Sequence, residues 1–234
     1  MIAILKREIQ AYFYSPLGYV FVGVYWVIAG FFFFNSNLIG NTTDMRSLFS
    51  MMFIITLFLI PILTMKLMSE DKKLKTDQIL LISPISSWEV VIGKFLAALF
   101  VYSIALSITI IMGVVLQYFS SPDWSLIIGH IFGTVLLGAM LIGITLFISA
   151  MTENQIVSAV LGFTVSFFLM LLNTLARFIP NKAIADFVVS FSPEQRYNDF
   201  TLGILDLSNV IYFVSFTLLF IYFAVSVFEM RRYR

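Results

Sequence analysis

The sequence predicts an all-α integral membrane protein with six transmembrane helices. Of its 234 residues, 60% are hydrophobic and 12% are charged, whereas soluble domains average about 45–50% apolar and about 25% charged residues. Six segments have the roughly 20 mostly apolar residues that a spanning helix needs. Their apolar runs are continuous, without the alternation of barrel strands, so helices are the expected spanning elements. The segments are 17–35, 48–66, 94–117, 126–150, 156–176 and 208–228.

A short amphipathic segment, residues 1–16, precedes the first span. Its apolar residues alternate with charged and polar ones and are Ile2, Ile4, Leu5, Ile9 and Phe13. This pattern predicts an interfacial helix that lies on the membrane surface with its apolar face in the lipid. Ser15-Pro16 then turns the chain into the bilayer, because the residue before a proline avoids the helical region. The alternative is a frayed polar terminus.

A dense polar block, SEDKKLKTDQILLISPISSWEVVIGK (69–94), separates the second and third spans. It holds eight of the 27 charged residues (14 basic and 13 acidic). Helical spacing predicts a short helix that Ser83-Pro84 ends; its stripe is Leu67, Asp71, Leu74, Gln78 and Leu81. Ser86 and Glu89 have capping-box spacing, which predicts a second helix running through Lys94 into the third span. The loop 67–93 therefore reads as an ordered contact surface for a soluble partner; the alternative is a solvated connector.

Two further connections complete the chain. The loop 151–155, between the fourth and fifth spans, is very short and has no Lys or Arg. The segment 177–207, between the fifth and sixth spans, is long but not hydrophilic. In it, Asn181 is placed to cap one helix, and Pro193 precedes a second apolar cluster. Both stretches are too short to span, so we expect interfacial or re-entrant helices, with a surface loop as the alternative.

Lysine and arginine are distributed unequally between the two sides of the predicted spans. One side carries ten, namely Lys6, Arg7, Lys66, Lys72, Lys73, Lys75, Lys94, Arg231, Arg232 and Arg234; the other carries Arg46, Arg177, Lys182 and Arg196. The positive-inside rule places both termini and the loop 67–93 in the cytoplasm.

Small residues four apart predict where spans pack closely, because they let helix backbones approach. Gly129 and Gly133 have this spacing in the fourth span, and Gly162 lies in a similar run in the fifth. Pro61 is expected to kink the second span.

The residues that catalysis or metal binding needs are missing. There is no cysteine and no paired-carboxylate, His-Glu-x-x-His or Gly-x-Ser-x-Gly pattern. His130 is the single histidine, so we expect it to be an interface residue or to donate an interhelical hydrogen bond rather than to bind a metal. Gly93-Lys94 is no phosphate-binding loop, because Phe95 follows where Ser or Thr is required. We therefore expect no catalytic residue, metal or cofactor in this chain, and the net charge of +1 gives no field for nucleic acid.

The spans also lack the ionisable residues with which ion-coupled carriers work. Their polar residues are expected near the span ends. An ion-coupled carrier is therefore disfavoured, and any transport must draw its energy from another polypeptide.

Three stretches of the sequence resemble the ABC transporter type-2 membrane permeases, and among these the gliding-motility permease subfamily. The stretches are REIQAYFYSPLGYVF, SEDKKLKTDQILLISPISSWEVVIGKFLAA and TLGILDLSNVIYFVSFTLLFIYFAVSVFEMRR. The middle one is the most specific. Its matching residues are Glu70, Asp71, Thr76, Ser83, Pro84, Ser86, Glu89, Gly93 and Lys94. It departs from the family pattern at Lys75, where glycine is usual, and at Asp77-Gln78.

The resemblance implies that residues 1–234 form one permease domain, with a cytoplasmic coupling helix that rests in a groove of a separate ATPase. The implied contacts are Glu70, Asp71, Lys73, Leu74, Thr76 and Asp77, with a second contact at Glu153 and Asn154. It also implies that residues 1–16 form a connecting helix at the inner leaflet. ATP and Mg belong to the partner ATPase. A second permease chain, identical or a paralogue, completes the pathway, with membrane lipid and an auxiliary outer-facing protein as further partners. The implied location is the bacterial cytoplasmic (inner) membrane.

The leading function is therefore the membrane subunit of an ATP-driven exporter. The main alternative is a non-transporting ABC assembly that passes ATP-driven motion to an outer or auxiliary partner. A membrane-embedded enzyme and an ion-coupled carrier are the remaining alternatives.

Overall fold

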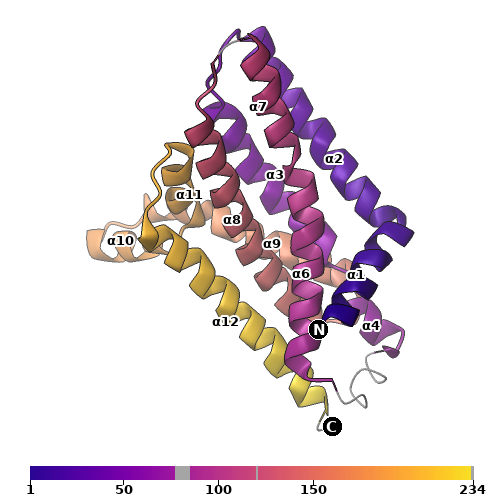
Figure 1. The fold of residues 1–234 in the computed structure, drawn as a ribbon. Helices are drawn as coiled ribbons and strands as arrows, with labels where there is room; N and C mark the ends of the chain where they lie inside the picture. The colour runs from indigo at the N-terminus through magenta and orange to yellow at the C-terminus, as the bar shows by residue number, and fades with distance from the viewer. Residues whose placement is uncertain (77–84, 120, 233–234) are drawn as a thin grey trace.

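A computed structural model describes residues 1–76, 85–119 and 121–232. These ranges contain helices and no strand (Figure 1). In chain order the helices are α1 (Ile2–Tyr14), α2 (Pro16–Phe33), the π-helix η1 (Phe34–Ile39), α3 (Arg46–Thr64), α4 (Ser69–Lys73), α6 (Ser87–Leu106), α7 (Ile108–Phe119), α8 (Trp124–Met151), α9 (Gln155–Ala176), α10 (Lys182–Ser190), α11 (Pro193–Thr201) and α12 (Leu207–Arg232).

Six helical segments within the described ranges are long and apolar enough to cross a membrane, which confirms the predicted fold class. They are Pro16–Ile39, Arg46–Lys73, Ser87–Phe119, Trp124–Met151, Gln155–Ala176 and Leu207–Arg231. The third differs from the expected single helix, because α6 ends at Leu106 and α7 begins at Ile108. At the break, the Ser107 hydroxyl donates to the Ile104 carbonyl at 2.7 Å. Such back-bonding competes with the helical ladder and bends helices.

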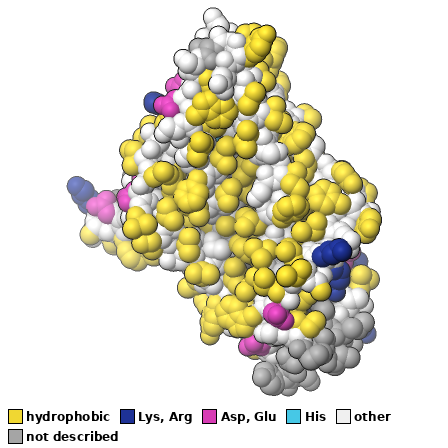
Figure 2. Space-filling view, in the orientation of Figure 1, with side chains coloured by type: hydrophobic (Ala, Val, Ile, Leu, Met, Phe, Trp, Pro, Cys, Tyr) yellow, Lys and Arg dark blue, Asp and Glu magenta, His cyan; other side chains and the backbone are white. Residues whose placement is uncertain are grey.

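Helix α8 is the centre of the bundle. It packs against α3, α6, α9 and α12, and 61% of its apolar window is buried, compared with 28% for α2, α9 and α12. The outer faces of those three helices are therefore available to lipid or to another chain. Figure 2 shows one such face covered by hydrophobic side chains, with charged side chains toward its margins and lower end. The two termini lie toward the same end of the molecule as α4 (Figure 1).

The glycines of the small-residue runs meet different neighbours. A Cβ atom at Gly133 would lie 2.6 Å from Cγ of Phe200 on α11, and one at Gly162 would lie 3.0 Å from Cβ of Pro61 on α3. A Cβ at Gly129 would meet nothing closer than 3.9 Å. A side chain would therefore collide with Phe200 at Gly133, would be tightly packed at Gly162, and would fit at Gly129.

The segment 177–207 contains two helices. The Asn181 side chain caps α10 by accepting a hydrogen bond from the Ala183 backbone N–H at 3.0 Å, as its position predicted. Pro193 is the first residue of α11. Helix α11 inserts Tyr197 and Phe200 into the protein, whereas α10 buries no side chain. Re-entry of these helices into the membrane stays a prediction.

Candidate functional site

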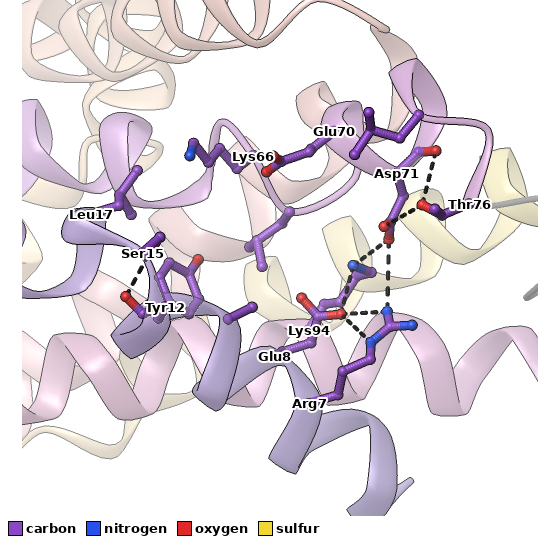
Figure 3. A pocket seen from close by; sticks show the side chains of 13 residues that line it. Arg7, Glu8, Tyr12, Ser15, Leu17, Lys66, Glu70, Asp71, Thr76 and Lys94 are labelled. Carbon is purple, nitrogen blue, oxygen red and sulfur yellow. Dashed lines mark hydrogen bonds and ion pairs between the residues drawn. The ribbon is translucent and has the colours of Figure 1, made fainter.

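Three segments that are distant in sequence meet at a cluster of charged side chains (Figure 3). The Lys94 ammonium on α6 lies 2.6 Å from Oδ2 of Asp71 on α4 and 3.0 Å from Oε1 of Glu8 on α1. The Lys94 side chain is only 2% exposed. A buried ammonium is tolerated only when it is paired, so these two carboxylates are what permit a lysine at this position.

Arg7 completes the cluster. One of its terminal nitrogens lies 2.6 Å from Glu8 Oε1 and 3.9 Å from Asp71 Oδ2. Partial burial lowers the pKa of Arg7, but its ion pairs with Glu8 and Asp71 outweigh this and leave the pKa raised. The Thr76 hydroxyl donates to Asp71 Oδ1 at 2.8 Å. Two cations and two anions therefore join α1, α4 and α6 in an arrangement with no net charge.

The charged cluster was not predicted from the sequence, although the spacing of the buried residues of α1 indicates part of it. Ile4, Glu8 and Tyr12 are the buried residues of α1 and recur every fourth position. A carboxylate on the buried face of an amphipathic helix requires a cationic partner. Gly93 lets that face approach α6, because a Cβ there would lie 2.9 Å from Ile4 Cγ2. The predicted helix over residues 1–16 is present, but its buried face contacts α6, and its place at a membrane surface stays a prediction.

Hydrogen bonds attach α4 to the end of α8 as well. The Ser149 hydroxyl accepts from the backbone N–H groups of Met68 and Ser69, both at 3.1 Å, and donates to the Met65 carbonyl at 3.2 Å. The Lys72 ammonium donates to the Ala150 carbonyl. A lysine near a helix C-terminus satisfies carbonyls that have no partner within the helix. Helix α4 is thus fixed on three sides, by α1, α6 and α8.

Helix α4 is shorter than the sequence indicated. The prediction of one helical stripe continuing from Leu67 through Leu74 is wrong, because α4 ends at Lys73 and Leu74 and Lys75 form a turn. Lys75 has φ +58°, a left-handed conformation that favours glycine and costs other residues about 1–2 kcal/mol. This is the position at which the resembled family usually has glycine. The predicted contact Asp77 and the break at Ser83-Pro84 lie outside the described residues.

The other residues predicted to contact the ATPase, apart from Asp77, differ in their exposure. Glu70, Asp71 and Thr76 line a cavity of about 340 Å³ between α1 and α4 (Figure 3). Lys73 is exposed, and Leu74, at the rim of that cavity, is 63% exposed. Among these candidates, Lys73 and Leu74 are therefore the exposed residues, whereas Glu70 and Asp71 are partly buried.

The second proposed contact lies in the loop between α8 and α9. The Asn154 side chain caps α9 by accepting from the Ile156 backbone N–H at 2.9 Å. The Glu153 carboxylate lies 3.2 Å from a guanidinium nitrogen of Arg231, near the end of α12. With its side chain 69% exposed, Glu153 can reach a partner while it remains tied to α12.

At the start of α6, the predicted helix boundary is confirmed, but the predicted capping box of Ser86 and Glu89 is wrong. Helix α6 begins at Ser87, directly after Ser86, but the Ser86 side chain makes no capping hydrogen bond. Glu89 instead lies 3.4 Å from the N-terminal amine of Met1.

The interior of the bundle contains a polar network that sequence reasoning missed. The Thr56 and Tyr102 hydroxyls are 3.0 Å apart, and Tyr102 also donates to the Thr134 carbonyl at 3.2 Å. The Tyr197 hydroxyl contacts the Thr134 hydroxyl at 3.1 Å and His130 Nε2 at 3.2 Å. The expectation that polar residues stay near the span ends is therefore wrong. The predicted interhelical hydrogen bond of His130 is confirmed, and its ring also stacks on Phe49 with centroids 3.4 Å apart.

Among the residues that the structure describes, no group of three or more His, Cys, Asp or Glu side chains is placed to hold a metal ion.

The chain was also compared with models of known protein families. Residues 3–231 match the family model described as ABC-2 family transporter protein. A search of curated protein sequences finds no match. The narrower resemblance to gliding-motility permeases stays a prediction. Because the matched region extends over nearly the whole chain and all six spans, this chain belongs to the ABC-2 transporter family.

Proposed function

We propose that this chain is the membrane subunit of an ATP-driven exporter, and that α4 and the loop 152–154 contact a separate cytoplasmic ATPase. ABC-2 membrane proteins in general work with such a subunit, and ATP and Mg bind there. The observation that carries the proposal is the attachment of α4 by ion pairs to α1 and α6 and by hydrogen bonds to α8. A force applied to α4 therefore reaches three helices at once.

A second permease chain fits the distribution of buried surface. The spanning segments that contain α2, α9 and α12 are each 28% buried in their apolar windows, so much of their apolar surface has no partner among the residues that the structure describes. We propose that two chains, identical or paralogous, enclose the pathway and that closure of the ATPase pair switches it between inward-facing and outward-facing states. The shared end of the termini and α4 (Figure 1) supports a cytoplasmic location for all three, in a bacterial inner membrane.

The alternative is an assembly that passes the motion to an outer partner without transport. Helix α10 favours it, because this helix buries no side chain and exposes Ile184 and Phe187 at 53% and 65%. An auxiliary outer protein would find an apolar surface there.

Affinity purification from native membranes in mild detergent tests the proposal. We expect a stoichiometric ATP-hydrolysing subunit to remain bound to the wild-type protein. It should be lost from the Lys73→Glu variant, which reverses the charge of an exposed residue on α4. The matched control is Lys182→Glu on α10, which should retain it. Retention by Lys73→Glu, or the absence of any nucleotide-binding protein, would contradict the proposal. ATP-dependent cargo movement in inside-out vesicles separates the exporter from the non-transporting assembly.

A further inference from the structure

The cavity beside the charged cluster contains two charged groups that the cluster does not use. It lies between α1, the end of α3 and α4, and its volume of about 340 Å³ falls within the range of about 300–1,000 Å³ of small-molecule sites. Lys66 and Glu70 both line it. Within the described part of the chain, neither forms an ion pair, in contrast to Glu8, Asp71 and Lys94 (Figure 3).

The two unpaired charges have opposite sign. A ligand that satisfies both must carry an anion for the Lys66 ammonium and a cation for the Glu70 carboxylate. Unpaired charges in a partly buried site are costly, so a zwitterion is favoured over a simple anion or cation. Apolar side chains, Leu17 and Leu67 among them, form much of the remaining wall, which indicates an amphiphile.

The wall of the cavity continues as an apolar stripe along α2. Leu17 lines the cavity, and the residues that follow it on the same side of the helix are Val20, Val24, Val27 and Phe31, with exposed fractions of 59%, 39%, 72% and 62%. Spacings of three and four residues place them on one face. Because α2 is the first candidate span, this stripe leads from the cavity into the hydrocarbon region, where acyl chains lie.

We propose that the cavity binds the headgroup of a phosphoethanolamine phospholipid, with its phosphodiester at Lys66 and its ammonium at Glu70, and its acyl chains along the α2 stripe. An ethanolamine ammonium donates charge-assisted hydrogen bonds to a carboxylate. A choline headgroup has no N–H to donate, and a glycerol headgroup has no positive charge for Glu70. The site therefore selects ethanolamine over both. This inference goes beyond the proposed function and does not depend on the ATPase.

Lipid retention by the full-length chain tests this site. The protein is reconstituted with equal amounts of phosphatidylethanolamine, phosphatidylglycerol and phosphatidylcholine, stripped with detergent, and analysed by native mass spectrometry. We expect wild-type protein to keep about one phosphatidylethanolamine per chain. Lys66→Gln and Glu70→Gln should each weaken its binding constant about tenfold, the effect of losing about 1.4 kcal/mol of hydrogen bonding, and so lower its occupancy. Lys66→Arg, which keeps the charge, should keep the lipid.

The control is Lys6→Gln, which removes an exposed cation of α1 outside the cavity and should retain the lipid as wild type does. Equal retention of the three lipids, or occupancy unchanged in both Gln variants, would show loosely bound surrounding lipid only and overturn the proposal. A loss in Lys6→Gln equal to that in Lys66→Gln would assign the effect to general surface charge. Displacement by an equal concentration of soluble phosphoethanolamine would overturn the assignment to a lipid.

Discussion

The buried ammonium of Lys94 on α6 lies 2.6 Å from the carboxylate of Asp71 on α4. This ion pair links α4, the helix proposed to contact the ATPase, to α6, the helix that begins the third span. Asp71 therefore stabilises the fold of the chain itself. A substitution at Asp71 is expected to lower the stability of the protein, whatever its effect on binding of a partner.

Asp71→Asn should destabilise the protein by about 3 kcal/mol. Removing one partner of a buried pair costs about 3–5 kcal/mol, and Glu8, 3.0 Å from Lys94, offsets part of that loss. The measurement is denaturant or thermal unfolding of the purified protein in detergent. The matched control is Asp44→Asn, whose carboxylate pairs with the exposed Arg46 at 3.8 Å and should cost less than about 1 kcal/mol. Equal losses in the two variants would contradict the buried pair.

Lys75→Gly should leave stability unchanged or raise it by up to about 1 kcal/mol. The left-handed φ of +58° costs lysine about 1–2 kcal/mol, which glycine would not lose. Glycine has greater conformational freedom in the unfolded chain, and this offsets part of the gain in stability. Lys73→Gly is the control with the opposite sign, because Lys73 is the last residue of α4 and glycine costs up to about 1 kcal/mol in a helix. Unfolding midpoints measure both, and a larger loss at Lys75 than at Lys73 would argue against the turn.

Gly133→Ala should destabilise the contact between α8 and α11 by about 1–3 kcal/mol. The added Cβ would lie 2.6 Å from the Phe200 ring, and overpacking of this kind displaces backbone or side chains. Gly129→Ala, one turn away, meets nothing closer than 3.9 Å and should change stability little. Comparison of the two unfolding midpoints checks the prediction, and equal effects would show that α11 does not press on Gly133.

Tyr197→Phe should cost about 0.6–1.7 kcal/mol, from the average to the maximum measured for hydrogen bonds inside a membrane bundle. The lost hydroxyl contacts Thr134 and His130 and donates to the Phe49 carbonyl at 3.2 Å. Tyr222→Phe, at a position 55% exposed on α12, is the control and should be neutral. A neutral Tyr197→Phe in the same unfolding assay would show that the interior network adds no stability.

The sequence predicted the spans well because their signal is local. Continuous apolar runs predicted six spanning segments, one of which is broken into two helices, and helix ends fall close to the expected residues, as with α3 at Arg46–Thr64 against 48–66. Caps that depend on one residue and its neighbours, such as Asn181 before α10, were also predictable.

Contacts between distant segments could not be read in the same way. Nothing near Lys94 in the sequence indicates that its partner is Glu8, since residues 1–14 reach α6 only through tertiary packing around Gly93. The tyrosine network was missed because tyrosine was counted among the hydrophobic residues, yet the hydroxyls of Tyr102 and Tyr197 must find partners once buried.

The measurement that tests the account most directly is site-specific crosslinking from α4. The chain has no cysteine, so Leu74→Cys provides a single attachment point for a photoreactive thiol reagent at a residue 63% exposed. Ile184→Cys on α10, 53% exposed, is the matched control. After irradiation in native membranes, we predict that Leu74→Cys transfers the label to an ATP-hydrolysing subunit and that Ile184→Cys does not. Label transfer to such a subunit from Ile184→Cys, with none from Leu74→Cys, would contradict the assignment of α4 as the coupling contact.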